Sequence, residues 1–347
     1  MAVIGTTALT YMDWAKRVED GGKAAMIIEL LSQTNEIMTD MLVVEGNLPT
    51  GHKTTVRTGL PSSSWRLYNT GVPTSKSTTA QIIATCGNLE AESQIDVDIA
   101  ALNGNSANFR LSEVAPFLES MNQTMAATLI YGNESINADR FTGFAPFYNT
   151  VSAATAQSAY NVIDAGGTGS DNTSIWIVCW GPNTVHGIFP KGKITGLNHQ
   201  DKGQHRVYDS NNNPYWAWVD HYKWELGLAI RDWRYVVRIC NIDVSDLATG
   251  SAANLINLLI RGLQRMPTTP VSSGPVQSSD APSIQGAMGQ TAIYVNRTLA
   301  TYLDLQATNK TNVLLQLGEF NGRPVTRFRG IPIRIVDAIL NNEARVV

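Results

Sequence analysis

One stretch of the chain carries residues at the spacing of a phosphate-binding loop. Gly187, Gly192 and Lys193 match the pattern G-x-x-x-x-G-K, in which backbone amides and a lysine ammonium bind phosphate oxygens. Ile194 stands where a Ser or Thr hydroxyl would bind magnesium, and Pro190 lacks a backbone N–H. No helical pattern follows, so no helix N-terminus would face the phosphate. These departures favour turns between strands over nucleotide binding.

Two histidines flank an aspartate in a polar segment, as His199, Asp201 and His205. Imidazole and carboxylate groups are common metal ligands, but neither H-E-x-x-H nor helical i, i+4 spacing is present. We therefore expect solvated histidines in a loop. His186 and His221 lie within strand patterns and are interpreted as partners of local polar groups.

Nucleophilic catalysis and cation binding each have one further candidate. The serines at 62–64 have only His52 nearby as a base, and no G-x-S-x-G turn occurs. The cation candidate is an acidic stretch formed by Glu90, Glu92, Asp96 and Asp98. We favour a solvated acidic face or ion pairs between subunits over a cation site. The sequence therefore predicts no catalytic residue, no metal ligand and no cofactor.

Composition indicates a chain that meets other copies of itself. Its 347 residues are enough for two domains or one domain with extensions. Hydrophobic residues make up 43% of the chain. Only 16% are charged, where about 25% is usual. Interface centres are depleted in Lys, Glu and Asp, so low charge indicates large contact surfaces. The alternative on composition alone is a secreted polar β-protein.

Charge, cysteine content and hydropathy argue against several classes. A net charge of −3 and a pI near 6.0 predict only weak, local and non-specific DNA contact. The cysteines at 86, 179 and 240 are odd in number and far apart, which suits a reducing cytoplasm better than a disulfide framework or a zinc site. The sequence shows no signal-peptide pattern and no run of 18 apolar residues, so we expect neither export nor a membrane partner.

Apolar spacing predicts two helices in the first half of the chain. The first covers most of residues 12–42, and the second covers residues 113–131. Ser112 can cap the second helix, Pro116 falls in its first turn, and Gly132 can end it. Its predicted buried stripe consists of Val114, Phe117, Leu118, Met121, Met125 and Leu129.

Between these helices the chain changes character. From Leu48 to Ala91 Thr, Ser, Gly and Pro dominate, and alternation in KTTVRT and STTAQIIAT predicts two strands around a long loop. Such a hairpin has too little apolar surface to be stable alone, so this arm must lie on something else. Its apolar anchors are Trp65, Leu67 and Tyr68.

The second half of the chain is rich in strands. Even-numbered apolar residues from 216 to 230 share one face, with only Asp220 out of pattern. Odd-numbered apolar residues from 233 to 239 continue the pattern, which predicts a long antiparallel hairpin with an aromatic face. A helix at 252–264 and a Pro/Ser loop at 267–283 follow.

The last strands carry a set of arginines, namely Arg323, Arg327, Arg329 and Arg334. They could contact DNA or pair with carboxylates of a neighbouring subunit. Strand alternation through VTRFRG and IPIRIV favours a neighbour at a sheet edge over a groove-reading helix.

The order of these parts resembles the Hong Kong 97-like major capsid proteins of tailed phages, within them the short-tailed group. The resemblance rests on the N-terminal arm, the Thr/Ser/Gly hairpin arm, the helix at 113–131 and the aromatic strands. The terminal unit TAIYVNRTLATYLDLQA followed by FRGIPIRIVDAI is similar to the axial domain of that family. The axial-like unit ends the chain here, which implies a permuted connectivity.

The resemblance implies an α+β fold in four parts. These are an N-terminal arm (1–48), an extended hairpin arm (49–94), a peripheral domain (95–244) with a long spine helix, and an axial α/β domain (245–347). It implies no enzyme and no identified crosslink. The implied function is a shell subunit that forms pentamers and hexamers around phage double-stranded DNA in a virion assembled in the host cytoplasm. Scaffolding, portal and possibly cement proteins are the implied partners.

Two alternatives remain open from the sequence. A nanocompartment shell, similar to an encapsulin, would share the fold but enclose an enzyme in place of a genome. A β-rich protein could use the Trp-rich strands to bind carbohydrate. We expect Trp65, Leu67, Tyr68 and the arginines at 323, 327 and 329 to contact neighbouring subunits.

Overall fold

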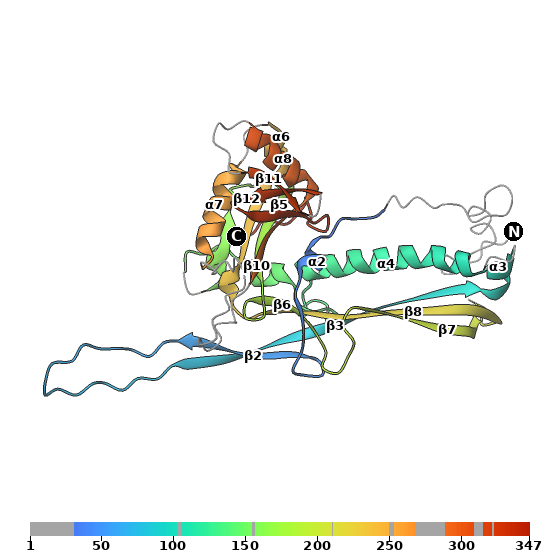
Figure 1. The fold of residues 1–347 in the computed structure, drawn as a ribbon, viewed down its shortest axis with the longest axis horizontal. Coiled ribbons are helices and arrows are strands. Elements are labelled where there is room, and N and C mark those ends of the chain that lie inside the picture. The colour runs from blue at the N-terminus through green and yellow to red at the C-terminus, as the bar shows by residue number, and fades with distance from the viewer. Residues whose placement is uncertain are drawn as a thin grey trace.

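A computed structural model describes residues 31–102, 106–154, 157–209, 211–249, 253–267, 289–308, 315–320 and 323–347. The predicted helix over residues 12–30 and nearly all of the Pro/Ser loop lie outside these residues. The described chain has a long lower layer of helix and strands, a compact upper part, and a hairpin arm that projects sideways (Figure 1).

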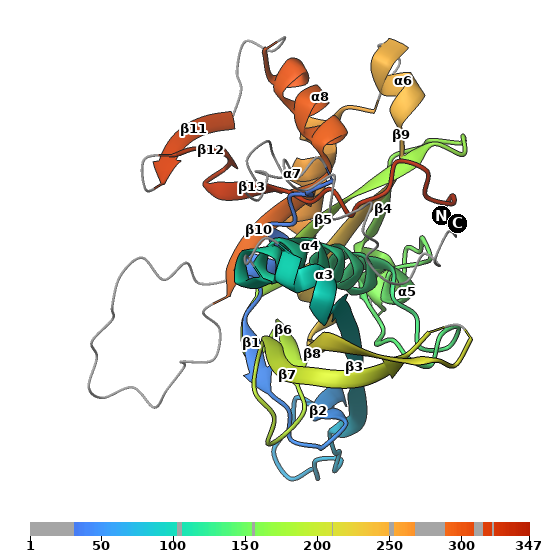
Figure 2. The same ribbon diagram turned by 90° about the vertical axis from the view of Figure 1, so that its right-hand side faces the viewer.

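The lower layer is one long helix on long antiparallel strands. Helix α4 (Ser106–Tyr131) lies along strands β3 (Thr78–Asp96), β8 (Pro214–Ile230) and β7 (Leu197–Tyr208). β8 is the central strand, because it pairs with β3 along one edge and with β7 along the other. An end-on view shows α4 on one side of these strands (Figure 2).

Helix α4 begins earlier than its sequence signals predict. It starts at Ser106, and the Ser112 hydroxyl donates to the Phe109 carbonyl where capping was predicted. Pro116 is therefore inside the helix, not in its first turn. Tertiary contacts explain the extension, because Phe109 is buried beside Ile95.

The predicted buried stripe of α4 is correct only toward the C-terminal end. Met121, Met125 and Leu129 are buried, and Phe117 stacks on Tyr222 with ring centroids 5.6 Å apart. Leu118 was predicted to be buried and is 38% exposed. Because the helix is straight and covers only a narrow strip of sheet, a side chain near the edge of the stripe faces solvent.

The predicted pairing of residues 215–230 with 233–239 is wrong. β8 pairs with β7, β3 and β6, whereas β9 (Val236–Asp243) pairs with β5 (Asn172–Trp180). The short helix η3 (Trp233–Tyr235) separates β8 from β9, and its Asp232 N-cap accepts from the Arg234 amide. This turn redirects the chain from the lower layer into the upper part.

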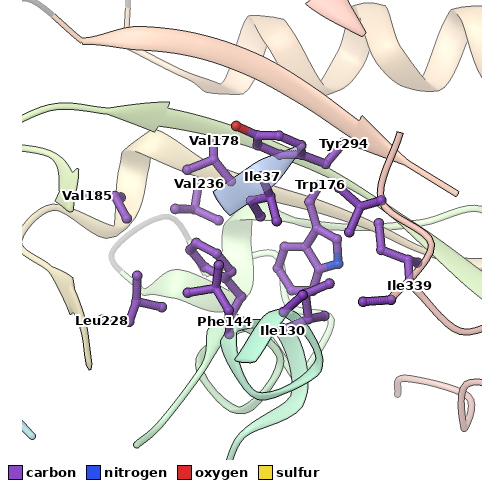
Figure 3. Packing of buried hydrophobic residues seen from close by; sticks show 14 of the residues in the cluster. Ile37, Ile130, Phe144, Trp176, Val178, Val185, Leu228, Val236, Tyr294 and Ile339 are labelled. Carbon is purple, nitrogen blue, oxygen red and sulfur yellow. The ribbon is translucent and has the colours of Figure 1, made fainter. Parts of the chain in front are cut away.

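The upper part is a mixed sheet with buried faces on both sides of β5. Odd residues of β5, such as Ile175 and Ile177, pack with helices α7 (Leu255–Arg265) and α8 (Arg297–Thr308). Even residues of β5 pack against the end of α4, where Trp176, Phe144 and Ile130 lie in one buried cluster (Figure 3). The two cores share β5 and β9 and join the upper part to the lower layer.

Within the described residues, thirteen strands form one continuous sheet, and β5 and β9 lie in it with β10. Strands on both sides of residue 244 thus share that sheet. The order along its main path is β11-β12-β13-β10-β5-β6-β8-β3-β2. The remaining elements are α2 (Ile37–Asp40), β1 (Val43–Glu45), β2 (Gly51–Gly59), α3 (Val97–Ala101), α5 (Phe144–Phe147), η2 (Ser158–Asn161), β4 (Val162–Asp164), β6 (Val185–Phe189), α6 (Val244–Thr249), β10 (Gln290–Val295), β11 (Leu315–Phe320), β12 (Arg323–Phe328) and β13 (Ile331–Ile335).

The N-terminal helix predicted to reach residue 42 is wrong for residues 31–42, where only α2 is helical. Asn35 instead bridges to Val336, and the Glu36 amide donates to the Ile335 carbonyl. β1 then pairs in parallel with β6. Residues 31–42 therefore pair with distant strands although their apolar spacing favours a helix, because tertiary contacts outweigh local helix propensity.

Candidate assembly surfaces

The hairpin arm is built as predicted, from two strands around a long loop. β2 pairs with residues 78–85 of β3, and the second half of β3 pairs with β8. Strand β3 therefore runs from the arm into the lower layer and connects the two. Gly227 of β8 lies opposite Cys86 at this root, and a Cβ there would overlap the Thr85 carbonyl oxygen.

The apolar anchors of the arm make no contact that buries them. Trp65 is 105% exposed, Tyr68 95% and Leu67 79%. A turn orders the residues around them, because the Thr70 amide and hydroxyl both donate to the Leu67 carbonyl. Isolated subunits rarely expose three large apolar side chains in one loop, so the loop is a candidate interaction surface.

A groove of about 1150 Å³ separates the root of the arm from the body. His52 of β2 lines this groove, and its ring lies against that of His186 of β6, with ring centroids 5.7 Å apart. Burial lowers the pKa of His186 to about 4, and His52 and Arg231 act in the same direction. Burial and Arg231 also lower the pKa of His52. The two imidazoles are therefore neutral at pH 7.

The apparent phosphate-binding segment lies at a strand end. Gly187 is inside β6, and a Cβ on it would press on the Met41 side chain. Gly192 has φ +78° in a turn, where the Lys193 amide donates to the Pro190 carbonyl. The positive φ explains the glycine at 192, and close packing explains the one at 187.

The polar segment at 197–208 is strand β7, not the predicted loop, and its histidines have protein partners. Nε2 of His199 lies 3.0 Å from Oδ1 of Asp220, and Nε2 of His205 lies 2.9 Å from the Lys202 carbonyl oxygen. Pairing with β8 along its length keeps this polar segment extended. In the part of the chain that the structure describes, no group of three His, Cys, Asp or Glu residues could hold a metal ion.

Asp220, the exception in the β8 pattern, is buried beneath α4. Nη2 of Arg110 lies 2.9 Å from its Oδ1 and 2.9 Å from Oδ2 of Asp201. The Arg110 guanidinium also stacks 4.5 Å over the Trp218 ring. The Gly203 amide and Arg110 lower the pKa of the Asp201 carboxyl. An ion pair therefore holds the N-terminal half of α4 on the sheet.

The acidic stretch makes local contacts. Glu90 lies 3.2 Å from Lys223 and 3.3 Å from His221, while Glu92 accepts from the Gln94 amide. The Asn88 amide and Lys223 lower the pKa of Glu90 to about 2. Asp96 caps α3 by accepting from the Asp98 amide. These carboxylates form an acidic face along β3.

The C-terminal arginines do not occupy a sheet edge. Arg323 and Arg327 lie on β12, which is covered by β11 on one side and by β13 on the other. Arg329, with φ +51°, is exposed in the turn after β12 and lies 5.9 Å over the Phe328 ring. Arg334 pairs with Asp40 at 3.2 Å. The prediction of an edge is wrong because β11 adds one more strand.

A buried ion pair that sequence reasoning missed holds the C-terminal tail. Arg238 of β9 and Glu343 are both 4% exposed and lie 2.8 Å apart. Glu343 also accepts from Tyr131 and Ser174, and Arg238 stacks 5.0 Å over Trp176. The local sign was an arginine among the apolar residues 236–240 of β9. Its partner is 105 residues away.

Comparison with known proteins identifies the fold. The family model for major capsid protein GP7 matches residues 19–347. A chain in the structure of bacteriophage epsilon15 is 33% identical, covers 100% of this chain and 99% of its own, and superposes with a TM-score of 0.76. No curated protein matches.

Two more distant structures are a native GTA particle capsid and the SrpI encapsulin of Synechococcus elongatus PCC 7942. They are 11% and 10% identical, cover 64% and 67% of this chain and 95% and 96% of their own, and give TM-scores of 0.46 and 0.39. The encapsulin likeness is too weak to support the nanocompartment alternative.

The fold and the exposed arm define a shell subunit of the Hong Kong 97-like class, found in phage capsids and self-assembling in the virion. The chain belongs to the major capsid protein GP7 family. Among the described residues, no helix is long and apolar enough to cross a membrane.

Proposed function

We propose that copies of this chain form the pentamers and hexamers of an icosahedral shell around phage double-stranded DNA, and that the arm at 49–94 joins neighbouring subunits. One observation carries the proposal for the arm. Trp65, Leu67 and Tyr68 are almost fully exposed in a loop that their own subunit does not cover. Burying such side chains against a neighbour supplies a large share of interface energy.

A second contact follows from the C-terminal arginines. Arg329 is exposed beside β12, which also carries Arg323 and Arg327. Guanidinium groups pair with carboxylates in a fixed geometry, so this strand suits a carboxylate-bearing neighbour. We include Arg329 among the contacts because its side chain is exposed.

The remaining parts of the proposal concern partners and place. Scaffolding and portal proteins, with a possible cement protein, assist assembly in the host cytoplasm, and the subunit itself catalyses no reaction. Contact with DNA is weak and non-specific, in keeping with a net charge of −3. The proposal also keeps the division of the chain into an N-terminal arm (1–48), a hairpin arm (49–94), a peripheral domain (95–244) and an axial domain (245–347).

The test of the arm is to change Trp65→Ser, Leu67→Ser and Tyr68→Ser together. We expect a folded subunit whose assembly requires at least about tenfold more protein, because each anchor is worth about 1 kcal/mol or more at an interface. Ile194→Ser is the control, since Ile194 is also exposed, at 75%, but lies outside the arm. Sedimentation measures particles. Normal particle formation by the triple variant would contradict the proposal.

A further inference from the structure

Charge is segregated between the arm and the rest of the chain. Residues 46–89 contain four basic residues and no Asp or Glu; the basic residues are Lys53, Arg57, Arg66 and Lys76. Residues 46–89, here called the cationic arm, stop short of Glu90 and Glu92 and contribute +4 to a chain whose net charge is −3, which leaves −7 on the other residues. The arm of one copy and the body of another have opposite charge.

The arm cations are available to a partner. All four are exposed, and none takes part in an ion pair within the described residues. The arm projects away from the lower layer and the upper part (Figure 1), so the carboxylates of its own subunit lie out of reach of the loop.

A matching acidic face lies on the other half of the same strand. Leu89 and Ile95 of β3 pack into cores on the α4 side. Residues alternate along a strand, so Glu90 and Glu92 face the opposite side, where both are exposed. Lys223 is shared between Glu90 and Glu225, at 3.2 and 3.4 Å, and Glu92 has no cationic partner among the described ion pairs. Lys202 also lies at this face, because its Nζ donates to the Gln200 side chain, which pairs across from His221. The face therefore carries three carboxylates, Glu90, Glu92 and Glu225, and two ammonium groups, Lys202 and Lys223.

We propose that the cationic arm of one copy binds the acidic half of β3 in a second copy. This rests on the proposed function of the arm as an intersubunit contact and names the surface that receives it. The two surfaces are different patches of one chain, so the contact is head-to-tail. Head-to-tail contacts close into rings when the rotation between subunits permits, as five- and six-membered capsomers require.

Electrostatic complementarity acts mainly on the rate and register of association. In this proposal, the exposed anchors Trp65, Leu67 and Tyr68 supply apolar contact. The opposite charges of the arm and of β3 determine the position at which the arm binds the neighbouring subunit. Assembly should therefore slow as salt rises, because screening lengths fall to about 8 Å at physiological ionic strength and to about 3 Å at 1 M.

The experiment is a charge exchange between the two patches. One variant carries Glu90→Lys and Glu92→Lys, a second carries Arg57→Glu and Lys76→Glu, and a third carries all four changes. Each pair alone should slow assembly at least about tenfold at low salt, followed by light scattering. The combined variant should recover most of the rate, because every subunit supplies both patches.

The control carries Lys191→Glu and Lys193→Glu, two exposed lysines outside both patches. It changes the net charge as the arm variant does, and we expect wild-type assembly. Thermal unfolding of each free subunit shows that the changes leave the fold intact.

The inference is overturned if the Glu90 and Glu92 variant assembles at the wild-type rate, or if the combined variant is not rescued. It is also overturned if the arm variant assembles normally and loses only DNA binding. The proposed function fails separately, if the variant lacking Trp65, Leu67 and Tyr68 still forms particles normally. A defect in that variant alone would keep the arm as the intersubunit contact and remove β3 as its receiving surface.

Discussion

At the scale of single residues, the histidine pair at the root of the arm connects burial with pH. His186 is 1% exposed, and its Nδ1 and that of His52 have no hydrogen-bond partner. Burial, His52 and Arg231 lower the pKa of His186 and outweigh the backbone hydrogen bond to Gly181, which raises it. A buried imidazole with no carboxylate beside it stays neutral in the folded state while it binds a proton in the unfolded state.

We predict from the pKa of His186 that the free energy of unfolding of the free subunit decreases as pH falls from about 6.5 to about 4. The folded pKa of His186 lies near 4 and the unfolded value is 6.5, so below 6.5 the unfolded state binds the extra proton. The loss should reach about 3 kcal/mol at the acidic end. Urea unfolding of wild type and His186→Gln across this range is the measurement. An equally steep decline in the variant would show that other groups cause it.

At the scale of elements, helix α4 and its strands show what local pattern can and cannot predict. Alternation along β8 placed its aromatic face correctly and singled out Asp220, yet the sequence could not show that Arg110 pairs with it, because that contact spans 110 residues. The pairing of β9 was predicted with β8 because neighbouring strands usually pair. The η3 turn sends β9 to β5 instead, and no short-range pattern specifies that choice.

Helix α4 gives a matched pair of substitutions that tests this placement. Leu129 is fully buried in the core at the junction, so Leu129→Ala should lower the free energy of unfolding by about 3 kcal/mol. Leu118 is 38% exposed, and Leu118→Ala should cost less than about 1 kcal/mol. Urea midpoints of the free subunits measure both. Equal losses would place the two leucines in comparable environments and contradict the arrangement of the helix.

At the scale of the whole molecule, the arm projects away from the parts that hold the cores (Figure 1). Its loop exposes large apolar side chains, while the cores lie in the lower layer and the upper part. Alternation in KTTVRT and STTAQIIAT predicted the hairpin, and its low apolar content predicted that its order comes from contacts outside its own core. The proposed receiving surface lies on a second copy, so the packing of one chain alone does not test it.

The arm can therefore be shortened with little effect on the fold. The Ser75 hydroxyl donates to the Ser62 carbonyl at 2.8 Å, so removing residues 63–74 and joining the ends by Gly-Ser leaves the strand pairing from Gly51 to Gly59 in place. The free energy of unfolding should change by less than about 1 kcal/mol, because the lost residues bury no core. Sedimentation should show no particles.

A Gly-Ser loop of equal length in place of residues 63–74 separates the two causes of that failure. If assembly depends on the side chains of the loop, this variant also folds and also fails to form particles. If it assembles, the length of the arm matters and the anchors Trp65, Leu67 and Tyr68 do not. Loss of folding in either variant would mean that the loop belongs to the core of its own subunit, because only core residues lower the stability of a free subunit by several kcal/mol.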